Sequence, residues 1–424
     1  MRLSFLFLLS LSSSGSTQTT FPYDINSTFT TAGTRNVRRD TGTYGPPVEE
    51  VHYYYDQWPI GISVSKTGRI FACYTRGTYK YTLGEISNLT AEVPYPNANL
   101  NSPPGGLAKS RDGILFGSND RDHFISVQAL FNTPDDRLWV LDTGRPTVNQ
   151  TGTPSIAYAA PGGPKLVAIN LTTNEIEKSY YFPADVHYPD SYMNDLRFDF
   201  RPNVTKSGKG LAYIVDSSNE GRNGFIMLDL GTGETWRHLT QNFGTLHINE
   251  DVPSYNGIPW YLHQRESSLN WQTEGLDGIE LSEDGEVMYF SPLTGDFLYS
   301  IETKYLRVNP RTDPLAIKAA NDNVKFLGGR GGNANGFSGD SNGNVYMLMP
   351  EHNAIYIYNS TIRQALPYVR DPRIIWPDSA NAGWDGYLYY NINQLPYQAD
   401  WNNGVDKRQY PGLILRSKLA DGAT

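Results

Sequence analysis

Acidic and amide side chains recur in this chain at the starts of short strand-like segments. They are Asn194 and Asp195, Asp277, Asn335, and Asp378. If the fold brings them together, their oxygens could bind a hard cation such as Ca²⁺ or the ammonium group of a ligand. Two aromatic residues beside them, Phe337 and Trp376, could stack on an aromatic ligand or hold a cation over the ring face.

Asp277 is the strongest candidate in this set. Gly278 follows it and allows backbone or ligand to approach closely. The alternation of Ile279 and Leu281 predicts a buried strand that fixes its position. Carboxylates at Asp277 and Asp378 would repel each other unless a cation lay between them. We therefore expect a ligand-binding site for a cation or cationic molecule, made by Asn194, Asp195, Asp277, Asn335, Phe337 and Asp378.

Other chemistry is less well supported. The seven histidines form no HExxH or other compact zinc spacing, which disfavours a zinc hydrolase. His187 and His263 stand beside aromatic residues in long connections, where they could cap the site or move a proton. Residues 329–334 fit G-x-G-x-x-A, but a strand follows instead of the helix that a dinucleotide needs. We interpret this segment as a flexible loop in which Arg330 could meet an anionic group.

The composition indicates a folded β protein. Of 424 residues, 39% are hydrophobic and 19% charged, which suits a sizeable core. Forty glycines, 27 prolines and 29 tyrosines against 6 methionines favour turns and aromatic strands over long helices. The formal net charge of −9 repels phosphate backbones and anionic lipids, so we expect neither nucleic acid nor a membrane as partner.

A repeat organises these strands. Each copy starts with small, acidic or amide residues, turns at Asp, Asn or Gly, and continues into a strand of alternating aromatic and aliphatic residues. Six copies occupy residues 61–74, 126–170, 194–229, 277–301, 336–358 and 376–391. Their spacing is typical of four-stranded propeller blades. The sequence therefore predicts an all-β, six-bladed β-propeller whose repeat starts face a central tunnel.

The ends of the chain indicate export. Arg2 and the apolar run 3–11 predict a signal peptide over residues 1–17, and no later run is long enough to span a bilayer. Residues 18–45 are expected to form a loose arm or to supply an outer strand, and residues 46–424 a single propeller domain. The strand-like tail 412–418 could help to close the ring.

The only cysteine, Cys73, excludes an intramolecular disulfide. We expect a monomeric, secreted glycoprotein with sequons at Asn26, Asn88, Asn149, Asn170, Asn203 and Asn359.

Residues 138–144, 212–217, 277–285 and 292–300 resemble the yellow and major royal jelly protein family. The resemblance implies a secreted six-bladed propeller, and functions that include quinone conversion in pigmentation, binding of biogenic amines, and nutrition. The repeat starts also resemble the metal-binding ring of gluconolactonase and senescence-marker propellers. However, the glutamate of their first blade has no counterpart in residues 58–63.

Three functions remain open from the sequence. The first is a secreted protein that binds a small aromatic or amine-bearing metabolite in the tunnel. The second is an extracellular enzyme, either a quinone isomerase with Asp277 or a capping histidine as base, or a lactone hydrolase that uses tunnel Ca²⁺. The third is a nutritive or structural protein.

Overall fold

The computed structural model describes residues 27–32, 35–74, 79–150 and 153–424. The chain divides into two compact units, residues 1–44 and 45–424. In the first unit, β1 (Ser27–Ala32) and β2 (Arg35–Asp40) pair as an antiparallel hairpin. The predicted signal peptide lies outside the described residues.

Six four-stranded antiparallel sheets make up the second unit, and they confirm the predicted six-bladed β-propeller. Blade 1 contains β4 (Gly61–Val64), β5 (Ile70–Cys73), β6 (Leu83–Asn88) and β7 (Ala91–Pro94). Blade 2 contains β10 (Val127–Thr133), β11 (Arg137–Asp142), β14 (Lys165–Asn170) and β15 (Glu175–Tyr181). Blade 3 contains β16 (Met193–Asp199), β17 (Leu211–Asp216), β18 (Gly224–Asp229) and β19 (Thr235–His238).

The remaining blades follow the same order from the centre outward. Blade 4 contains β24 (Leu276–Leu281), β25 (Val287–Pro292), β26 (Phe297–Glu302) and β27 (Lys325–Gly329). Blade 5 contains β28 (Phe337–Gly339), β29 (Val345–Met349), β30 (Ala354–Asn359) and β31 (Gln364–Arg370). Blade 6 contains β32 (Pro377–Ala382), β33 (Tyr387–Ile392), β34 (Gly412–Lys418) and β3 (Glu49–Tyr54).

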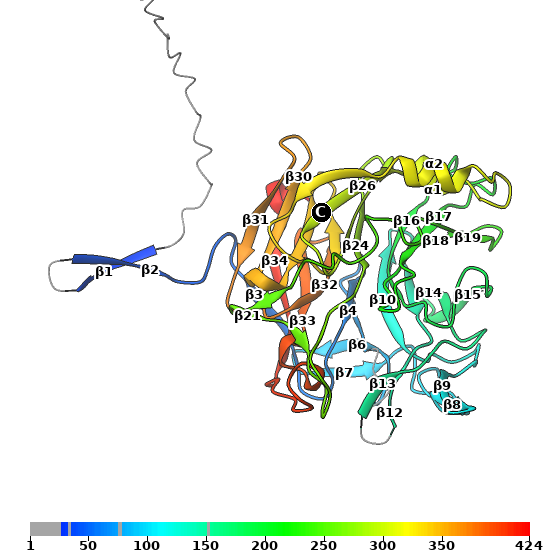
Figure 1. The fold of residues 1–424 in the computed structure, drawn as a ribbon, viewed down its shortest axis with the longest axis horizontal. Coiled ribbons are helices and arrows are strands. Elements are labelled where there is room, and N and C mark those ends of the chain that lie inside the picture. The colour runs from blue at the N-terminus through cyan, green and yellow to red at the C-terminus, as the bar shows by residue number, and fades with distance from the viewer. Residues whose placement is uncertain (1–26, 33–34, 75–78, 151–152) are drawn as a thin grey trace, which may run out of the picture. The chain divides into compact units, whose positions relative to one another are not determined.

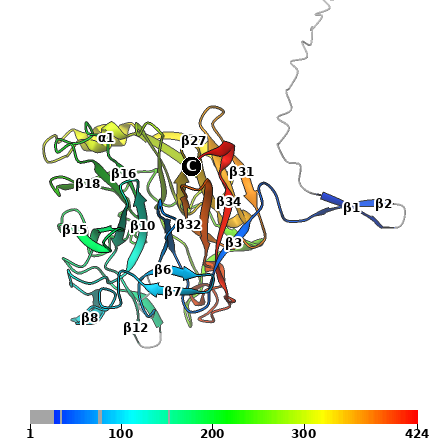
Figure 2. The same cartoon turned by 180° about the vertical axis from the view of Figure 1, so that it is seen from behind.

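The ring is closed in blade 6 by strands from distant parts of the chain. Its outermost strand, β3, pairs antiparallel with β34, the predicted tail strand. The closing strand is thus Glu49–Tyr54, and no part of residues 18–45 that the structure describes takes this role. Each innermost strand lies against the innermost strands of both neighbouring blades, from β4 through β10, β16, β24, β28 and β32 and back to β4. Figures 1 and 2 show β10, β4 and β32 near the middle of the propeller and β15 and β31 near its edge.

The hydrophobic core lies between adjacent blades. Trp139 of blade 2, for example, packs against Phe198 of blade 3, with the ring centroids 4.7 Å apart. Phe225 of blade 3 meets Phe290 of blade 4 edge-on at 5.4 Å. Because both faces of most strands are covered in this way, β17 and β18 are buried at every residue. This packing holds the innermost strands, and the side chains they carry, in fixed positions.

Connections of varied length decorate the ring. The hairpins are β8 (Ala108–Arg111) with β9 (Ile114–Gly117), β12 (Thr147–Gln150) with β13 (Thr153–Ile156), β20 (Ser254–Tyr255) with β21 (Ile258–Pro259), and β22 (Tyr261–Leu262) with β23 (Asn270–Trp271). The helices are α1 (Thr303–Arg307), α2 (Ala316–Asp322), η1 (Pro350–His352), η2 (Leu395–Tyr397), η3 (Ala399–Trp401) and η4 (Ala420–Gly422). In the described part of the chain, none of the helices is long and apolar enough to cross a membrane.

Candidate functional site

A cavity of about 870 Å³ runs between the innermost strands of the propeller. It extends from the connections that lead into these strands, at Glu274 and Trp376, to the hairpin turns that follow them, at Pro134 and Asp284. Asn194, Asp195, Asp277, Asn335, Phe337 and Asp378 all line it. The structure therefore brings the predicted site residues to one cavity.

A shared irregularity of the strands places these side chains. The register shifts by one residue near the start of β10, β16, β24 and β32, where two residues oppose one on the next strand. Gln128 is the extra residue in β10. The two residues that oppose one are Asn194 and Asp195 in β16, Asp277 and Gly278 in β24, and Asp378 and Ser379 in β32. Just before β28, Asn335 and Gly336 both hydrogen-bond the backbone of Leu348. Such β-bulges turn side chains away from the normal alternation, and here they present polar groups to the cavity.

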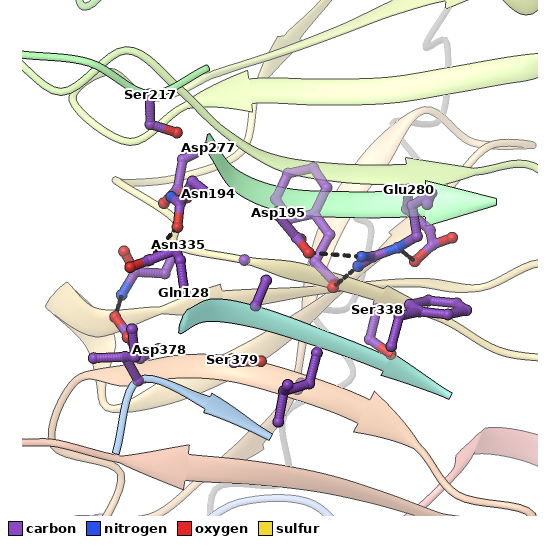
Figure 3. Close-up of a pocket in the computed structure, with 18 of the residues that line it drawn as sticks. Gln128, Asn194, Asp195, Ser217, Asp277, Glu280, Asn335, Ser338, Asp378 and Ser379 are labelled. Carbon is purple, nitrogen blue, oxygen red and sulfur yellow. Dashed lines mark hydrogen bonds and ion pairs between the residues drawn. The ribbon is translucent and has the colours of Figure 1, made fainter. Parts of the chain in front are cut away.

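A chain of hydrogen bonds connects three blades at this level. The Tyr192 hydroxyl donates to Gln128 Oε1 over 2.7 Å. Gln128 Nε2 donates to Asn194 Oδ1, and Asn194 Nδ2 donates to Asp277 Oδ1. Figure 3 shows Gln128, Asn194 and Asp277 together on one side of the cavity. Every donor in this chain points toward Asp277, so its carboxylate is the final acceptor.

A second polar group comes from blades 5 and 6. Asn335 is 2% exposed, and its Nδ2 donates to the Pro377 carbonyl at 3.0 Å and to Asp378 Oδ1 at 3.4 Å. The indole N–H of Trp376 donates to the same oxygen at 3.3 Å. Trp376 has a φ of +57°, which is rare for a bulky residue and marks a position held by its surroundings. Asp378 is thereby fixed as an acceptor at the cavity wall.

The carboxylate of Asp277 is buried in an acidic environment. Its residue is 5% exposed. Burial raises its pKa well above the usual range, and the charges of Glu274, Asp378 and Asp195 add to the effect, while Arg330 opposes it. Among the described residues, Asp277 Oδ1 has one hydrogen-bond donor, Asn194 Nδ2, and Asp277 Oδ2 has none. The Oδ2 atom is therefore free to accept a hydrogen bond from a bound molecule.

Farther along the strands, the side chain of Arg197 connects blades 3, 4 and 5. Arg197 is 5% exposed, and it pairs with Asp195 at 2.9 Å and with Glu280 at 2.7 Å. Its Nη2 atom also donates to the carbonyl of Phe337. Burial opposes the charge of Arg197, but the two carboxylates outweigh burial and raise its pKa. Figure 3 shows Asp195 and Glu280 set apart from the Asp277 group, so Asp195 belongs to an ion-pair network and not to the chain that ends at Asp277.

The cavity as a whole is acidic and rich in aromatic rings. Eleven acidic residues and three arginines are among the described residues that line it. The arginines, Arg145, Arg197 and Arg201, each already pair with at least one carboxylate. Eight aromatic residues share the lining: Phe131, Tyr192, Phe198, Phe200, Phe337, Trp376, Trp384 and Trp401. The excess of carboxylates gives the cavity a negative potential that attracts cations.

Phe337 lines the cavity and also packs in the protein core. Its residue is 1% exposed, and it packs in a core cluster with Leu298, Val345 and Met347. The ring also lies over Gly278, so close that a Cβ at position 278 would be 2.6 Å from two ring carbons. The ring therefore supports the bulge that carries Asp277, and its carbonyl holds Arg197.

Three tryptophans cover the cavity at the end where the innermost strands begin. Trp260 stacks on Trp401 with centroids 4.0 Å apart and touches Trp376 at 4.2 Å. Trp260 and Trp401 come from the two long connections before β24 and β34. These connections are joined by backbone hydrogen bonds between His263 and Asp400 at 2.8 Å and between Asn403 and His263 at 2.7 Å. His263 thus joins the connections through its backbone.

The expectations for His187 and Arg330 need correction. His187 lies 7% exposed in the protein interior, where burial lowers its pKa to about 4, and it is not among the residues that line the cavity. Arg330 is 1% exposed instead of lying on a flexible rim. Its guanidinium donates to the carbonyls of Pro292, Gly295 and Phe297. Burial lowers its pKa to about 10, and it supports the turn between β25 and β26 without contacting an anion in the cavity.

The described residues do not fit a calcium site. In the part of the chain that the structure describes, no three His, Cys, Asp or Glu side chains are grouped so that they could hold a metal ion. Ca²⁺ needs six to eight oxygen ligands, whereas the oxygens Asn194 Oδ1 and Asp277 Oδ1 already accept hydrogen bonds from neighbouring amides. The first blade contributes the apolar Ile60 and Val64 to the lining. This arrangement suits an organic cation better than a metal ion.

The sequence interpretation missed Gln128 and Tyr192. A usable signal was present, because each bulge has one or two polar or glycine residues between apolar ones. This pattern is seen at 127–129, 193–196, 276–279 and 377–380. Of the predicted glycosylation sites, Asn88, Asn203 and Asn359 are exposed. Asn170 is half-buried and donates to Glu177 at 2.8 Å. Asn26 and the side chain of Asn149 lie outside the described residues.

Comparison with known proteins agrees with the resemblance drawn from the sequence. Protein yellow of Drosophila madeirensis is 27% identical over 184 residues, 42% of this chain and 28% of that protein. The chain therefore spans less than a third of the length of the curated yellow proteins that it matches. A luciferin-regenerating enzyme superposes with a TM-score of 0.51 at 12% identity, over 90% of this chain and 97% of that one. Regucalcin from Agrobacterium tumefaciens superposes with a TM-score of 0.47 at 10% identity, over 87% of this chain and 94% of that one.

A family model described as major royal jelly protein matches residues 125–378. This match covers more than half of the chain and includes blades 2 to 5 with most of the bulged strands. The chain belongs to the major royal jelly protein family.

Proposed function

We propose that this protein is a secreted binding protein for a small aromatic amine, which it holds in the propeller tunnel with the ammonium group at Asp277. The observation that carries the proposal is the buried carboxylate of Asp277. One of its oxygens accepts from Asn194, and the other has no partner among the described residues. A buried charge without a counterion is costly, so a cationic ligand would relieve an unfavourable site.

The electrostatics of the cavity support a cation. Carboxylates outnumber guanidinium groups eleven to three in the described lining, and the guanidinium groups are already paired. Glu274 and Asp378 lie close enough to Asp277 to raise its pKa. An ammonium group at Asp277 Oδ2 would therefore interact favourably with several carboxylates at once.

The dimensions and walls support an organic ligand. A volume of about 870 Å³ lies within the usual range of small-molecule pockets, about 300 to 1,000 Å³. Trp376 and Trp401 line the cavity near its covered end. Trp376 is 2% exposed and packs on Trp260, whereas Trp401 is half-buried, so its indole could stack on an aromatic ring whose amine reaches Asp277.

Export is part of the proposal. The apolar run at residues 3–11 with Arg2 before it is typical of a signal peptide. The exposed sequons Asn88, Asn203 and Asn359 could accept glycans. When the protein is expressed in a secreting eukaryotic cell, it should be found in the medium and should lose mass when N-linked glycans are removed. Protein that stays inside the cell without glycans would contradict this part of the proposal.

Calorimetric titration with tyramine tests the binding function. The matched ligand 4-ethylphenol keeps the ring and lacks the ammonium group, and it should bind at least tenfold more weakly. The variant Asp277→Asn keeps the shape of the side chain and removes its charge. Because a hydrogen bond to a charged group contributes about 1.5 to 3 kcal/mol, tyramine affinity should fall roughly 10- to 100-fold.

The control variant is Asp122→Asn, which makes the same change in net charge at an exposed position away from the cavity lining. It should bind tyramine as the wild type does. Absence of binding to tyramine and to other aromatic amines would refute the proposal and favour a nutritive or structural role. Equal affinity in Asp277→Asn and wild type would show that the amine, if bound, lies elsewhere.

A further inference from the structure

The hydrogen-bond chain from Tyr192 to Asp277 has a defined polarity. Asp277 in its charged form can only accept, so Asn194 must present its amide N–H₂ to the carboxylate. Asn194 Oδ1 then accepts from Gln128 Nε2, and Gln128 Oε1 accepts from the Tyr192 hydroxyl. The hydroxyl is thus the first donor, and it stabilises this orientation of both amides by donating to Gln128 Oε1.

The position of Tyr192 is itself rigidly held. The residue is 8% exposed, and its backbone N–H donates to Asp216 Oδ1 at 2.9 Å. Asp216 is fully buried and pairs with Arg237 at 2.9 Å. The backbone at Tyr192 is thereby tied to the interior of blade 3.

Without the hydroxyl, Gln128 Oε1 loses its donor, and the two amides could turn by 180° together. Asn194 would then present Oδ1 to Asp277, an arrangement that favours the protonated carboxyl. Burial and the carboxylates of Glu274, Asp378 and Asp195 act in the same direction, whereas Arg330 acts against it. The chain of donors also favours the charged form of Asp277.

We propose that Tyr192, acting through Gln128 and Asn194, is a positioning residue that holds Asp277 as a hydrogen-bond acceptor and thereby makes the tunnel select ligands with an ammonium group. This inference rests on the proposed function and adds the residues that determine its specificity. Tyr192 lines the cavity as well, but the role assigned to it depends on its hydroxyl and not on contact with the ligand.

The test is the pH dependence of tyramine binding in Tyr192→Phe, measured by calorimetry between pH 5 and pH 8.5. At neutral pH the affinity should fall roughly fivefold, the effect of one neutral hydrogen bond. The pH at which affinity is half lost should move upward, because Asp277 protonates more readily. At the highest pH the variant and the wild type should converge, because Asp277 is charged in both.

A double-mutant cycle separates this role from a general structural one. Gln128→Met breaks the chain at its second member with little change in size. If Tyr192 acts only through Gln128, the double variant should bind tyramine no more weakly than Gln128→Met alone. The control Tyr390→Phe removes another buried hydroxyl, which bonds Ser417 at 2.9 Å in blade 6, and it should leave the affinity and its pH dependence unchanged.

Three results would overturn the inference while leaving the amine-binding function intact: wild-type affinity in Tyr192→Phe at every pH, a loss by the same factor at every pH, or additive losses in the double variant. A wild-type protein that does not bind tyramine would overturn the proposed function and this inference together.

Discussion

Substitution of Gly278 by alanine should destabilise the propeller and displace the Asp277 site together. Gly278 is the second residue of the bulge in β24. A Cβ built there would lie 2.6 Å from Cδ1 and from Cε1 of Phe337 and 2.7 Å from the Asn335 carbonyl oxygen. Normal carbon contacts need about 3.5 to 4.0 Å, so either the ring or two bulged strands must move by about an ångström.

The expected cost follows from the surroundings. Phe337 is 1% exposed among Leu298, Val345 and Met347, so the ring has no free space in which to turn. Overpacking of a dense core costs about 1 to 3 kcal/mol. Because backbone as well as side chain obstructs the new methyl group, we expect the upper part of that range. Urea unfolding followed by tryptophan fluorescence measures the change.

Two further variants make this prediction specific. Gly105→Ala adds a methyl group whose nearest neighbour is the flexible end of Lys109, at 3.3 Å, and its stability should change by less than about 1 kcal/mol. Shortening the obstructing ring by Phe337→Leu should cost less in the Gly278→Ala background than in the wild type, because the two changes partly compensate. Wild-type stability in Gly278→Ala, or fully additive losses in the double variant, would refute the packing argument.

Three other predictions concern titration and the free thiol. Burial lowers the pKa of His187 to about 4 from an ordinary value of 6.5, so stability is lost as pH falls through this interval, by about 3 kcal/mol in total. The variant His187→Gln should lose less stability between pH 7 and pH 4 than the wild type, and parallel curves would contradict the assignment. The folded-state pKa of Asp277 is raised by burial and by neighbouring carboxylates, so its contribution to stability is present in acid and lost as pH rises through that pKa. Asp277→Asn should therefore gain stability relative to the wild type from pH 4 to pH 8, and a relative loss would show that the carboxylate is paired. Cys73 is fully buried, and burial raises its pKa, so Ellman's reagent should label the native protein only as fast as it unfolds; complete labelling within seconds would show that blade 1 opens readily.

The blades were predictable because their signal is local. Each repeat combines a polar start, a tight turn and an alternating strand within a short segment, and six such segments in series indicate a propeller. The closing strand β3 was not predictable in this way. Its sequence, Glu49–Tyr54, resembles an ordinary edge strand, and its partner β34 lies at the opposite end of the chain.

The site was predictable in composition more than in geometry. Asp277, Asn194, Asn335 and Asp378 stand at repeat starts, and the topology alone brings repeat starts to one axis. Gln128 occupies the same position in blade 2, but a neutral glutamine did not suggest binding chemistry by itself. The hydrogen-bond chain depends on one-residue bulges, which the residue pattern marks only after the register is known.

Long-range packing accounts for the remaining differences. Arg330 stands in a glycine-rich segment that suggests a mobile loop, yet its guanidinium finds three carbonyl oxygens in one turn of blade 4. Trp260 and Trp401 come from separate connections, and no sequence pattern relates them. Phe337 is itself a predicted site residue, and no sequence pattern indicates that its ring also fills the space left by the absent side chain of Gly278.

The most direct test of the central claim is a crystal structure of the protein soaked with tyramine. We predict that the ammonium nitrogen lies about 2.8 Å from Asp277 Oδ2, with Asn194 Nδ2 still donating to Oδ1 and the aromatic ring toward Trp376 and Trp401. Tyramine bound outside the cavity, or inside it with the ammonium group away from Asp277, would contradict the claim.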